Sequence, residues 1–341
     1  MENPHRSYLL MSFVAAIMTT CYAGRCLAED QLVPKHVLTV SPELTDSDES
    51  TNISGAACAV QTKTLTSCLL IGDEVKWARF FALDGDKLVP AKPIFLLPKK
   101  HKVNGQPVKY KETDAEGISF YNGAYYLIGS HGLNKSGEYQ DSRYFIYRVK
   151  VDASTGLVDD FGMEDQPAAG VEKSANLELV LKQDPTLEPH IKEKPDVGLN
   201  IEGIAVSGDN VYLGFRSPLP NNKAIVASIS IKDAFDNPQA ALVLHPVDLG
   251  AGMGVRDIAA VDGGFLILSG PQEDKAGPAQ VCFWKPGSPE SYCHNLKKAG
   301  PDNSKPEALT LLDSTADAYK VLVISDGPMN GAPAIYEIPR K

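Results

Sequence analysis

Four acidic residues of this 341-residue chain stand at the start of a recurring segment, each followed by a short apolar run. They are Glu116, Glu202, Asp257 and Glu307. In each segment a turn follows, and then a second apolar run that ends in polar or charged residues. Carboxylates gathered on one apolar scaffold are unfavourable unless cations, arginine side chains or backbone amides satisfy them. The recurrence therefore predicts a site where several acidic side chains gather and require cations, arginines or backbone amides as partners.

The chemistry of this site depends on what satisfies the acids. Carboxylates from different segments suit a hard divalent cation such as Ca²⁺, which takes about six to eight oxygen ligands. We therefore expect a divalent cation, calcium first, with Glu116, Glu202, Asp257 and Glu307 as metal ligands. In the contrary interpretation these acids accept backbone N–H bonds or pair with arginine, and they perform no chemistry.

Arg216 and Arg256 belong to the same predicted site. A guanidinium group at the mouth of a channel suits bidentate binding of a carboxylate or phosphate, so we expect a small anionic ligand. Counting outward from the turns places Glu202 opposite Arg216, and Glu116 opposite Ser130. The predicted ligand-binding residues are Glu116, Ser130, His131, Glu202, Arg216, Arg256, Asp257, Glu307 and Asp326, with Asp73 and Glu74 at the same end.

The elements that carry these residues are repeated β-hairpins. The clearest copy is 200–219, where a Gly-Asp-Asn turn separates two apolar strands. Copies at 116–132 and 257–271 turn at Asn-Gly and Gly-Gly pairs, which are typical of tight hairpins. A fourth copy spans 306–327, and a weaker fifth copy spans 53–74.

Copies that begin at intervals of 62, 86, 55 and 50 residues predict a β-propeller, whose blades have about 40 to 50 residues. We expect an all-β single propeller of about six blades, with five to seven allowed and a short helix in an insert over 169–195. The inner strand of each blade would line the channel and bring the acids to one mouth. Closure is expected between 36–40 and 334–338. The competing fold is a β-sandwich with many hairpins.

The first 28 residues are interpreted as a secretory signal peptide, which leaves 29–341 as the propeller domain. His5 and Arg6 precede an apolar run that is too short to span a bilayer, and small residues lead to Ala28. We therefore expect a periplasmic or secreted protein without membrane insertion.

Four cysteines follow residue 28, and we expect the local disulfides Cys58–Cys68 and Cys282–Cys293. Each pair flanks a short segment with two strands joined by a turn, which brings its ends together. Zinc is the weaker alternative, because the chain has no CxxC motif.

The charge of the chain limits its partners. The formal net charge is −10, and it becomes −11 without residues 1–28. An acidic chain disfavours nucleic acid, because phosphate binding requires a basic surface. The basic run at 99–102 is interpreted as a solvated loop before a turn. We expect a monomer whose partner is a small molecule.

Several motifs connect the chain to a known family. They are IGSHG at 128–132, GLNIEG at 198–203, GFRSP at 214–218, GVRDI at 254–258 and PEALT at 306–310. On these motifs the chain resembles a bacterial family of uncharacterised exported proteins, domain of unknown function 3616, which is grouped with the β-propellers. The Glu-Gly-Ile start is also distantly similar to that of esterase-like phytases and gluconolactonase-type propellers. This second resemblance implies carboxylates that hold a metal around the channel.

The function that these patterns favour is binding of a small anionic ligand, with a divalent cation, at the acidic mouth of an exported propeller. One alternative is a metal-dependent hydrolase of a phosphoester or lactone, in which a carboxylate is the general base. Another is a protein-interaction platform. Ser130 and His131 suggest a nucleophile and base, but adjacent strand residues point to opposite sides and no GxSxG motif surrounds them.

Overall fold

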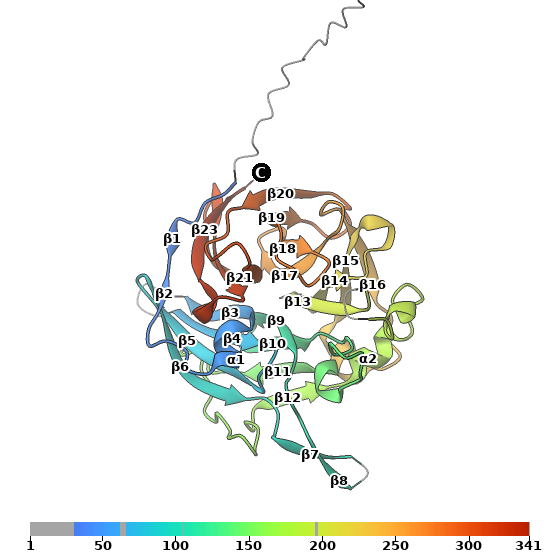
Figure 1. Cartoon of the computed structure of the whole chain (residues 1–341). Helices are drawn as coiled ribbons and strands as arrows, with labels where there is room; N and C mark the ends of the chain where they lie inside the picture. Colours follow the sequence, from blue (N-terminus) through green and yellow to red (C-terminus); the bar gives the residue numbers. More distant parts are fainter. Residues whose placement is uncertain (1–30, 62–65, 104, 195–196, 341) are drawn as a thin grey trace, which may run out of the picture. The chain divides into compact units, whose positions relative to one another are not determined.

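Five sheets surround a common axis, which is the arrangement of a β-propeller (Figure 1). Each blade has four antiparallel strands, and one sheet has a fifth strand at its edge. The computed structural model describes residues 31–61, 66–103, 105–194 and 197–340. The predicted signal peptide therefore lies outside the described residues. The inner strands of neighbouring blades lie side by side around the axis. From the axis outward, the first blade contains β3 (Ile53–Gln61), β4 (Thr66–Gly72), β5 (Trp77–Asp84) and β6 (Lys87–Phe95), and the second contains β9 (Ala115–Tyr121), β10 (Ala124–Gly129), β11 (Ile146–Lys150) and β12 (Val171–Ser174). The third blade contains β13 (Asn200–Ser207), β14 (Asn210–Ser217), β15 (Ala224–Ser230) and β16 (Val243–Val247), and the fourth contains β17 (Met253–Val261), β18 (Gly264–Pro271), β19 (Ala279–Trp284) and β20 (Ser291–Leu296). The fifth blade contains β21 (Lys305–Ser314), β22 (Ala318–Asp326), β23 (Ala334–Pro339) and β1 (His36–Val37).

The all-β propeller is confirmed, with five blades, which is within the expected range and one fewer than the favoured six. The 86-residue interval between the second and third hairpins holds no additional blade. It contains the outer strands of the second blade and a predicted helix, α2 (Asn176–Leu181). The basic run 99–102 forms part of a separate hairpin, β7 (Lys100–Val103) and β8 (Gln106–Lys109), which projects from the propeller (Figure 1).

Pairing between the two ends of the domain closes the propeller, as expected. Strand β1 is antiparallel to β23, with His36 opposite Ile335. Strand β2 (Thr39–Val40) adds a parallel edge to β6. The remaining elements are short: α1 (Ser47–Thr51), α3 (Ile231–Asp236), η1 (Asp141–Tyr144), η2 (Glu188–His190), η3 (Pro220–Asn222) and η4 (Met329–Gly331). Among the described residues, no helix has the length and apolar character needed to cross a membrane.

Local sequence explains the hairpins, and burial between blades explains the packing. Asn122 and Gly123 have φ of 47° and 77°, as a tight two-residue turn between β9 and β10 requires. Both predicted disulfides are present, and each joins directly opposite residues of antiparallel strands, Cys58 with Cys68 and Cys282 with Cys293. Five apolar clusters fill the spaces between neighbouring blades. The blades therefore hold the ends of the inner strands in a fixed ring.

Candidate functional site

The innermost strand of every blade contains a β-bulge near its start. In β9, Ala115 pairs with Gly129 and Gly117 pairs with Ile128, so Glu116 has no opposite residue on β10. A bulge of this kind bends the strand and re-aims a side chain. The residues at the five bulges are Ser54, Glu116, Glu202, Arg256 and Glu307.

This register corrects the predicted position of Asp257. Arg256, not Asp257, is equivalent to Glu202, and a shift of one residue turns a strand side chain to the other face. The fully buried Asp257 carboxylate accepts the N–H of Ile258 at 2.8 Å and of Leu309 at 2.7 Å. Burial raises the pKa of Asp257, although these two N–H groups oppose the rise. Asp257 therefore joins the inner strands of two blades and does not line the cavity described below.

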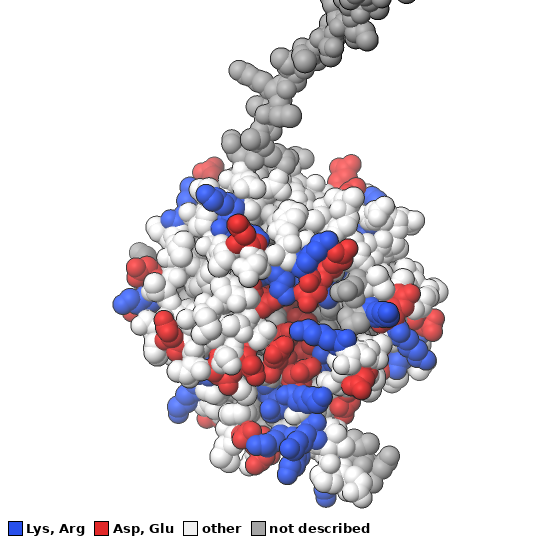
Figure 2. Space-filling view, viewed as in Figure 1, with Lys and Arg blue, Asp and Glu red and all other residues white. Residues whose placement is uncertain are grey.

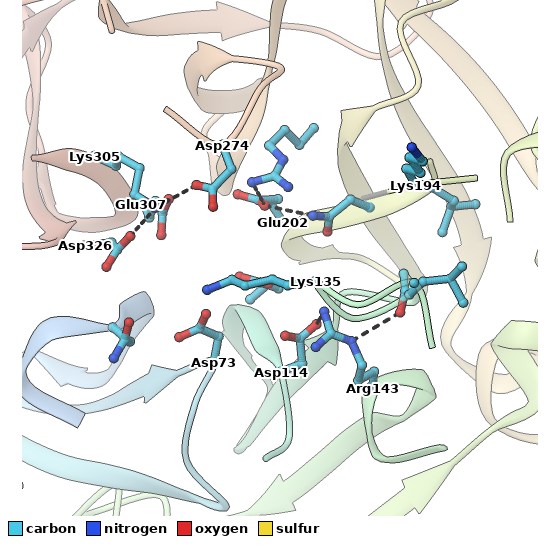
Figure 3. Close-up of a pocket in the computed structure, with 18 of the residues that line it drawn as sticks. Asp73, Asp114, Lys135, Arg143, Lys194, Glu202, Asp274, Lys305, Glu307 and Asp326 are labelled. Atoms are coloured by element: carbon cyan, nitrogen blue, oxygen red, sulfur yellow. Dashed lines mark hydrogen bonds and ion pairs between the residues drawn. The ribbon is translucent and has the colours of Figure 1, made fainter. Parts of the chain in front are cut away.

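A cavity of about 590 Å³ opens where the bulges meet. Glu116, Glu202 and Glu307 all line it, so the repeat does bring these three predicted acids together. Figure 2 shows acidic side chains near the centre of this face, with Lys and Arg beside them. The charged residues of the lining are Asp73, Asp114, Glu116, Glu202, Asp274, Glu307 and Asp326, with Lys135, Arg143, Lys194, Arg216 and Lys305 (Figure 3).

Arg256 lies behind the cavity wall, where it neutralises two of the acids. Its Nη1 lies 3.2 Å from Glu202 Oε2 and 3.0 Å from Glu307 Oε1. Its Nη2 donates to the carbonyl groups of Pro271 and Glu273 at 2.9 and 3.1 Å. The residue is only 2 % exposed and is not part of the cavity lining, so the structure places this predicted ligand-binding residue in an internal ion pair.

Arg216 lines the cavity and keeps an unused donor. Its Nη1 lies 3.0 Å from Glu202 Oε1, so the two predicted partners meet. The predicted register is wrong, because the bulges leave Glu202 and Glu116 without an opposite residue on the second strand. Its Nε is buried without a hydrogen-bond partner. Burial lowers the pKa of Arg216, but the carboxylates of Glu202 and Glu116 raise it overall. The guanidinium therefore remains charged.

Lys305 gathers the acids on the same side of the cavity. Its Nζ contacts Asp326, lies 2.7 Å from Asp274 Oδ1 and lies 3.9 Å from Glu307 Oε1. Burial lowers the pKa of Lys305, but these three carboxylates raise it overall. Burial also raises the pKa of Glu307 to about 8, against the opposing effect of Arg256. Glu307 is therefore a carboxyl group that can exchange a proton near neutral pH.

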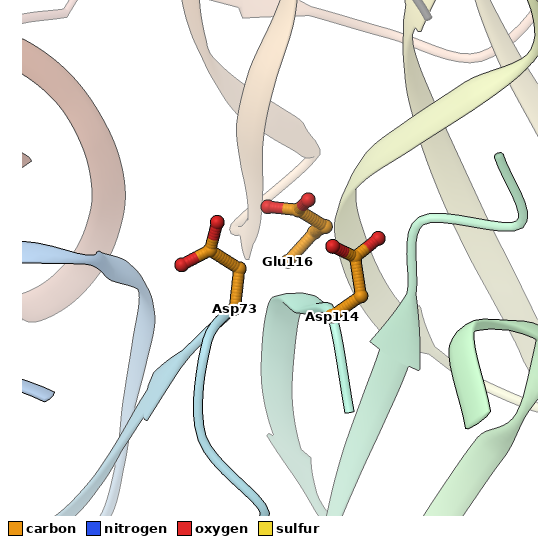
Figure 4. Close-up of side chains that lie close together, drawn as sticks. All are labelled: Asp73, Asp114 and Glu116. Carbon is orange, nitrogen blue, oxygen red and sulfur yellow. The ribbon is translucent and has the colours of Figure 1, made fainter. Parts of the chain in front are cut away.

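The opposite side of the cavity carries three acids with less compensation. One carboxylate oxygen from each of Asp73, Asp114 and Glu116 lies within 4.8 Å of the other two (Figure 4). Burial raises the pKa of Asp73 and Glu116, and neighbouring carboxylates raise both further. Burial raises the pKa of Asp114 to about 6, although Arg143, whose Nη2 lies 2.6 Å from Asp114 Oδ2, lowers it. These three carboxylates could together coordinate a cation.

Ser130 and His131 are placed beside the cavity wall and do not line it. The Ser130 hydroxyl accepts the N–H of Gly132 at 3.1 Å, and His131 Nδ1 lies 2.9 Å from the carbonyl oxygen of Gly129. Burial lowers the pKa of His131 to about 4. Among the described residues no hydrogen bond links the Ser130 hydroxyl to a His131 nitrogen, so the arrangement lacks the contact that a serine nucleophile requires.

Several lining residues were not anticipated, although the repeat contains a signal for some of them. Asn52, Asp114, Asn200 and Lys305 each stand two residues before a bulge, and all four line the cavity. Alternate residues of a strand share a face, so this spacing could have identified them. The other unanticipated charges do not follow the repeat: Arg143 lies in η1, and Lys135, Lys194 and Asp274 lie in loops.

The fold and the charged channel mouth define a β-propeller with a polar cavity. The family described as "Protein of unknown function (DUF3616)" matches residues 95–332, and the chain belongs to this family. This confirms the resemblance carried by the sequence motifs. No curated protein matches the chain in sequence.

Solved structures with a similar trace have low identity. The major allergen Mala s 1 of Malassezia sympodialis is 12 % identical, with a TM-score of 0.39 over 89 % of this chain and 82 % of the allergen. Zg3597, a family 117 glycoside hydrolase of Zobellia galactanivorans, is 10 % identical, with a TM-score of 0.43 over 91 % of this chain and 90 % of the hydrolase. An exo-β-1,3-galactanase of Phanerochaete chrysosporium is 10 % identical, with a TM-score of 0.44 over 92 % of this chain and 65 % of the galactanase. At these scores no inference about ligand or activity follows.

Proposed function

We propose that this chain is an exported β-propeller that binds a small anionic ligand in the charged cavity. The observation that carries the proposal is Arg216, which lines the cavity with its Nε unpartnered. A buried guanidinium with a free donor suits a carboxylate or phosphate group, which it can bind through two parallel hydrogen bonds. A volume of about 590 Å³ is in the usual range for small-molecule sites.

The rest of the cavity adds to this preference. Lys194 contributes a second positive charge from an exposed loop, and Lys135 is 82 % exposed, with Nζ 3.6 Å from Glu74. Both side chains can move toward a bound anion, because neither is held by a close ion pair. Arg216 would orient the ligand while these lysines add long-range attraction.

Export is supported by two disulfides, which form and persist in oxidising compartments. The signal peptide predicted over residues 1–28 adds to this argument. The proposed location is the periplasm or the medium. Amino-terminal sequencing of the mature protein from each cell fraction tests it. An intact start in the cytoplasm would contradict the proposal.

Calorimetric titration with orthophosphate, citrate and a sugar phosphate tests the binding proposal. Replacing Arg216→Gln should weaken binding about 10- to 100-fold, because a hydrogen bond to a charged group is lost. Arg148→Gln is the matched control: it removes the same charge from β11 on an outer part of the second blade. Equal affinities in the Arg216 variant and the control, or no binding of any of these anions, would refute the proposal.

A metal-dependent hydrolase remains the second candidate, on the evidence of Glu307. This cavity-lining carboxyl group has a pKa near 8, which suits proton transfer at neutral pH. Chromogenic phosphomonoesters, esters and lactones, assayed with Ca²⁺, Mg²⁺ and Mn²⁺, test it. Turnover that is lost in Glu307→Gln would support the hydrolase proposal. No turnover with any of these cations would exclude hydrolysis of these substrates.

A further inference from the structure

We propose that Asp73, Asp114 and Glu116 hold one divalent cation on the wall of the cavity across from Lys305 and Glu307. This inference deepens the proposed function, since the cation would share the cavity with the anionic ligand. It replaces the ligand set expected from sequence, of which only Glu116 remains.

Three separate features of the backbone bring the carboxylates together. Asp73 stands in the turn directly after β4, and Asp114 precedes β9 with a φ of 48°, a left-handed conformation that Asp tolerates better than most residues. The Asp114 N–H donates to the Asp73 carbonyl oxygen at 2.9 Å, which fixes the two loops side by side. Glu116 is aimed toward them by its bulge. The arrangement is therefore set by main-chain structure.

The strongest observation concerns Glu116. The residue is 9 % exposed, and among the described residues no hydrogen bond or close ion pair is found for its carboxylate. Asp73 Oδ1 is likewise without a hydrogen-bond partner and shielded from solvent. Glu202 and Glu307, by contrast, are paired with Arg256. A buried carboxylate without a directly paired cation is costly, and a bound cation lowers this cost.

The neighbouring basic side chains do not fulfil this role. Arg143 contacts Asp114 but is shared with Glu112, whose Oε1 lies 2.9 Å from its Nη1. Lys135 is 82 % exposed, and its ion-pair partner is Glu74, 3.6 Å from Nζ, and not one of the three acids. Arg143 therefore orients one ligand, while Asp73 and Glu116 stay available to a cation.

The donor set indicates a hard ion. All three residues offer carboxylate oxygens, as Ca²⁺, Mg²⁺ and Mn²⁺ prefer. The three oxygens lie within 4.8 Å of one another, so one ion with ligands about 2.4 Å away can contact all three. Three protein ligands leave positions for water and for one oxygen of the anionic ligand. The cation and Arg216 would then both hold the anion.

Calorimetric titration of the chelator-treated protein with CaCl₂, MgCl₂ and MnCl₂ tests the site. We expect one ion per chain, and at least about tenfold weaker binding in Asp73→Asn and in Glu116→Gln. The control is Asp274→Asn, which removes a lining carboxylate already paired with Lys305 and should change the affinity by less than about threefold.

The melting temperature in EDTA distinguishes a binding role from a structural one. Neutral Asn or Gln relieves repulsion between the acids, so both ligand variants should melt no lower than the parent protein without metal and lose its stabilisation by metal. No cation binding, or equal loss in the Asp274 control, would overturn the site. Cation binding without any anion binding would overturn the proposed function alone. Equal binding of citrate with and without EDTA would refute the shared site and leave the anion proposal standing.

Discussion

Replacing Arg256→Met should show that this arginine stabilises the channel mouth and does not bind the ligand. The change keeps an unbranched side chain of moderate length but removes the charge between Glu202 and Glu307. It also leaves the carbonyl groups of Pro271 and Glu273 without their donor. Removal of one partner from a buried ion pair costs about 3–5 kcal/mol, because the remaining charges stay buried.

The expected change in melting temperature follows from the size of the propeller. Unfolding entropy is about 2.1 cal/mol/K per residue, which makes it roughly 0.65 kcal/mol/K for a domain of this length. A loss of about 3–5 kcal/mol then lowers the melting temperature by about 5–8 °C. The effect should also depend on pH. Arg256 lowers the pKa of Glu307, so without it Glu307 holds its proton more strongly and the deficit should be smaller at pH 5 than at pH 8.

Thermal melts followed by near-ultraviolet circular dichroism at both pH values measure this loss. Arg148→Met is the matched control, since its ion pair with Glu172 is 28 % and 43 % exposed and contributes at most about 1 kcal/mol. An Arg256 variant that melts like this control at pH 8, yet binds anions more weakly, would refute the reasoning. Arg256 would then be a ligand contact, as the sequence suggested.

Three further outcomes follow from the structure. Asp257→Ala should lower the free energy of unfolding by about 2–5 kcal/mol in urea melts, because two buried N–H groups lose their acceptor; a change below about 0.5 kcal/mol would contradict its role as a bridge. Glu307 has a raised pKa of about 8 in the folded protein, so its contribution to stability is present below pH 4.5 and lost as pH rises to about 8; the parent protein should lose more stability over this window than Glu307→Gln, and parallel pH profiles would refute the shift. In a variant without the other disulfide, reduction of the Cys282–Cys293 bridge should lower the free energy of unfolding by about 2–4 kcal/mol, because the bridge no longer restricts the unfolded chain. Identical melts with and without reductant would contradict this stabilising role.

Much of the fold was determined by local sequence. Turn pairs such as Asn122-Gly123 require a hairpin, and apolar strands on both sides of them have one way to bury their faces. The same reasoning located both disulfides, because a hairpin brings its ends together. The pairing of β1 with β23 was expected because a propeller closes its ring by pairing the two ends of the chain. The blade count was less accessible, since an insert and a blade occupy similar lengths of chain.

The site was determined by tertiary structure to a larger degree. Glu116, Glu202 and Glu307 could be grouped from the repeat, but one bulged residue decides whether Arg256 or Asp257 reaches Glu202 and Glu307. A pattern of alternating residues cannot detect this, because the bulge changes the period locally. The partners of each charge also lie far apart in sequence: Arg256 is 51 residues from Glu307. Which carboxylates are neutralised, and which are left for a cation, follows only when five blades place them around one cavity.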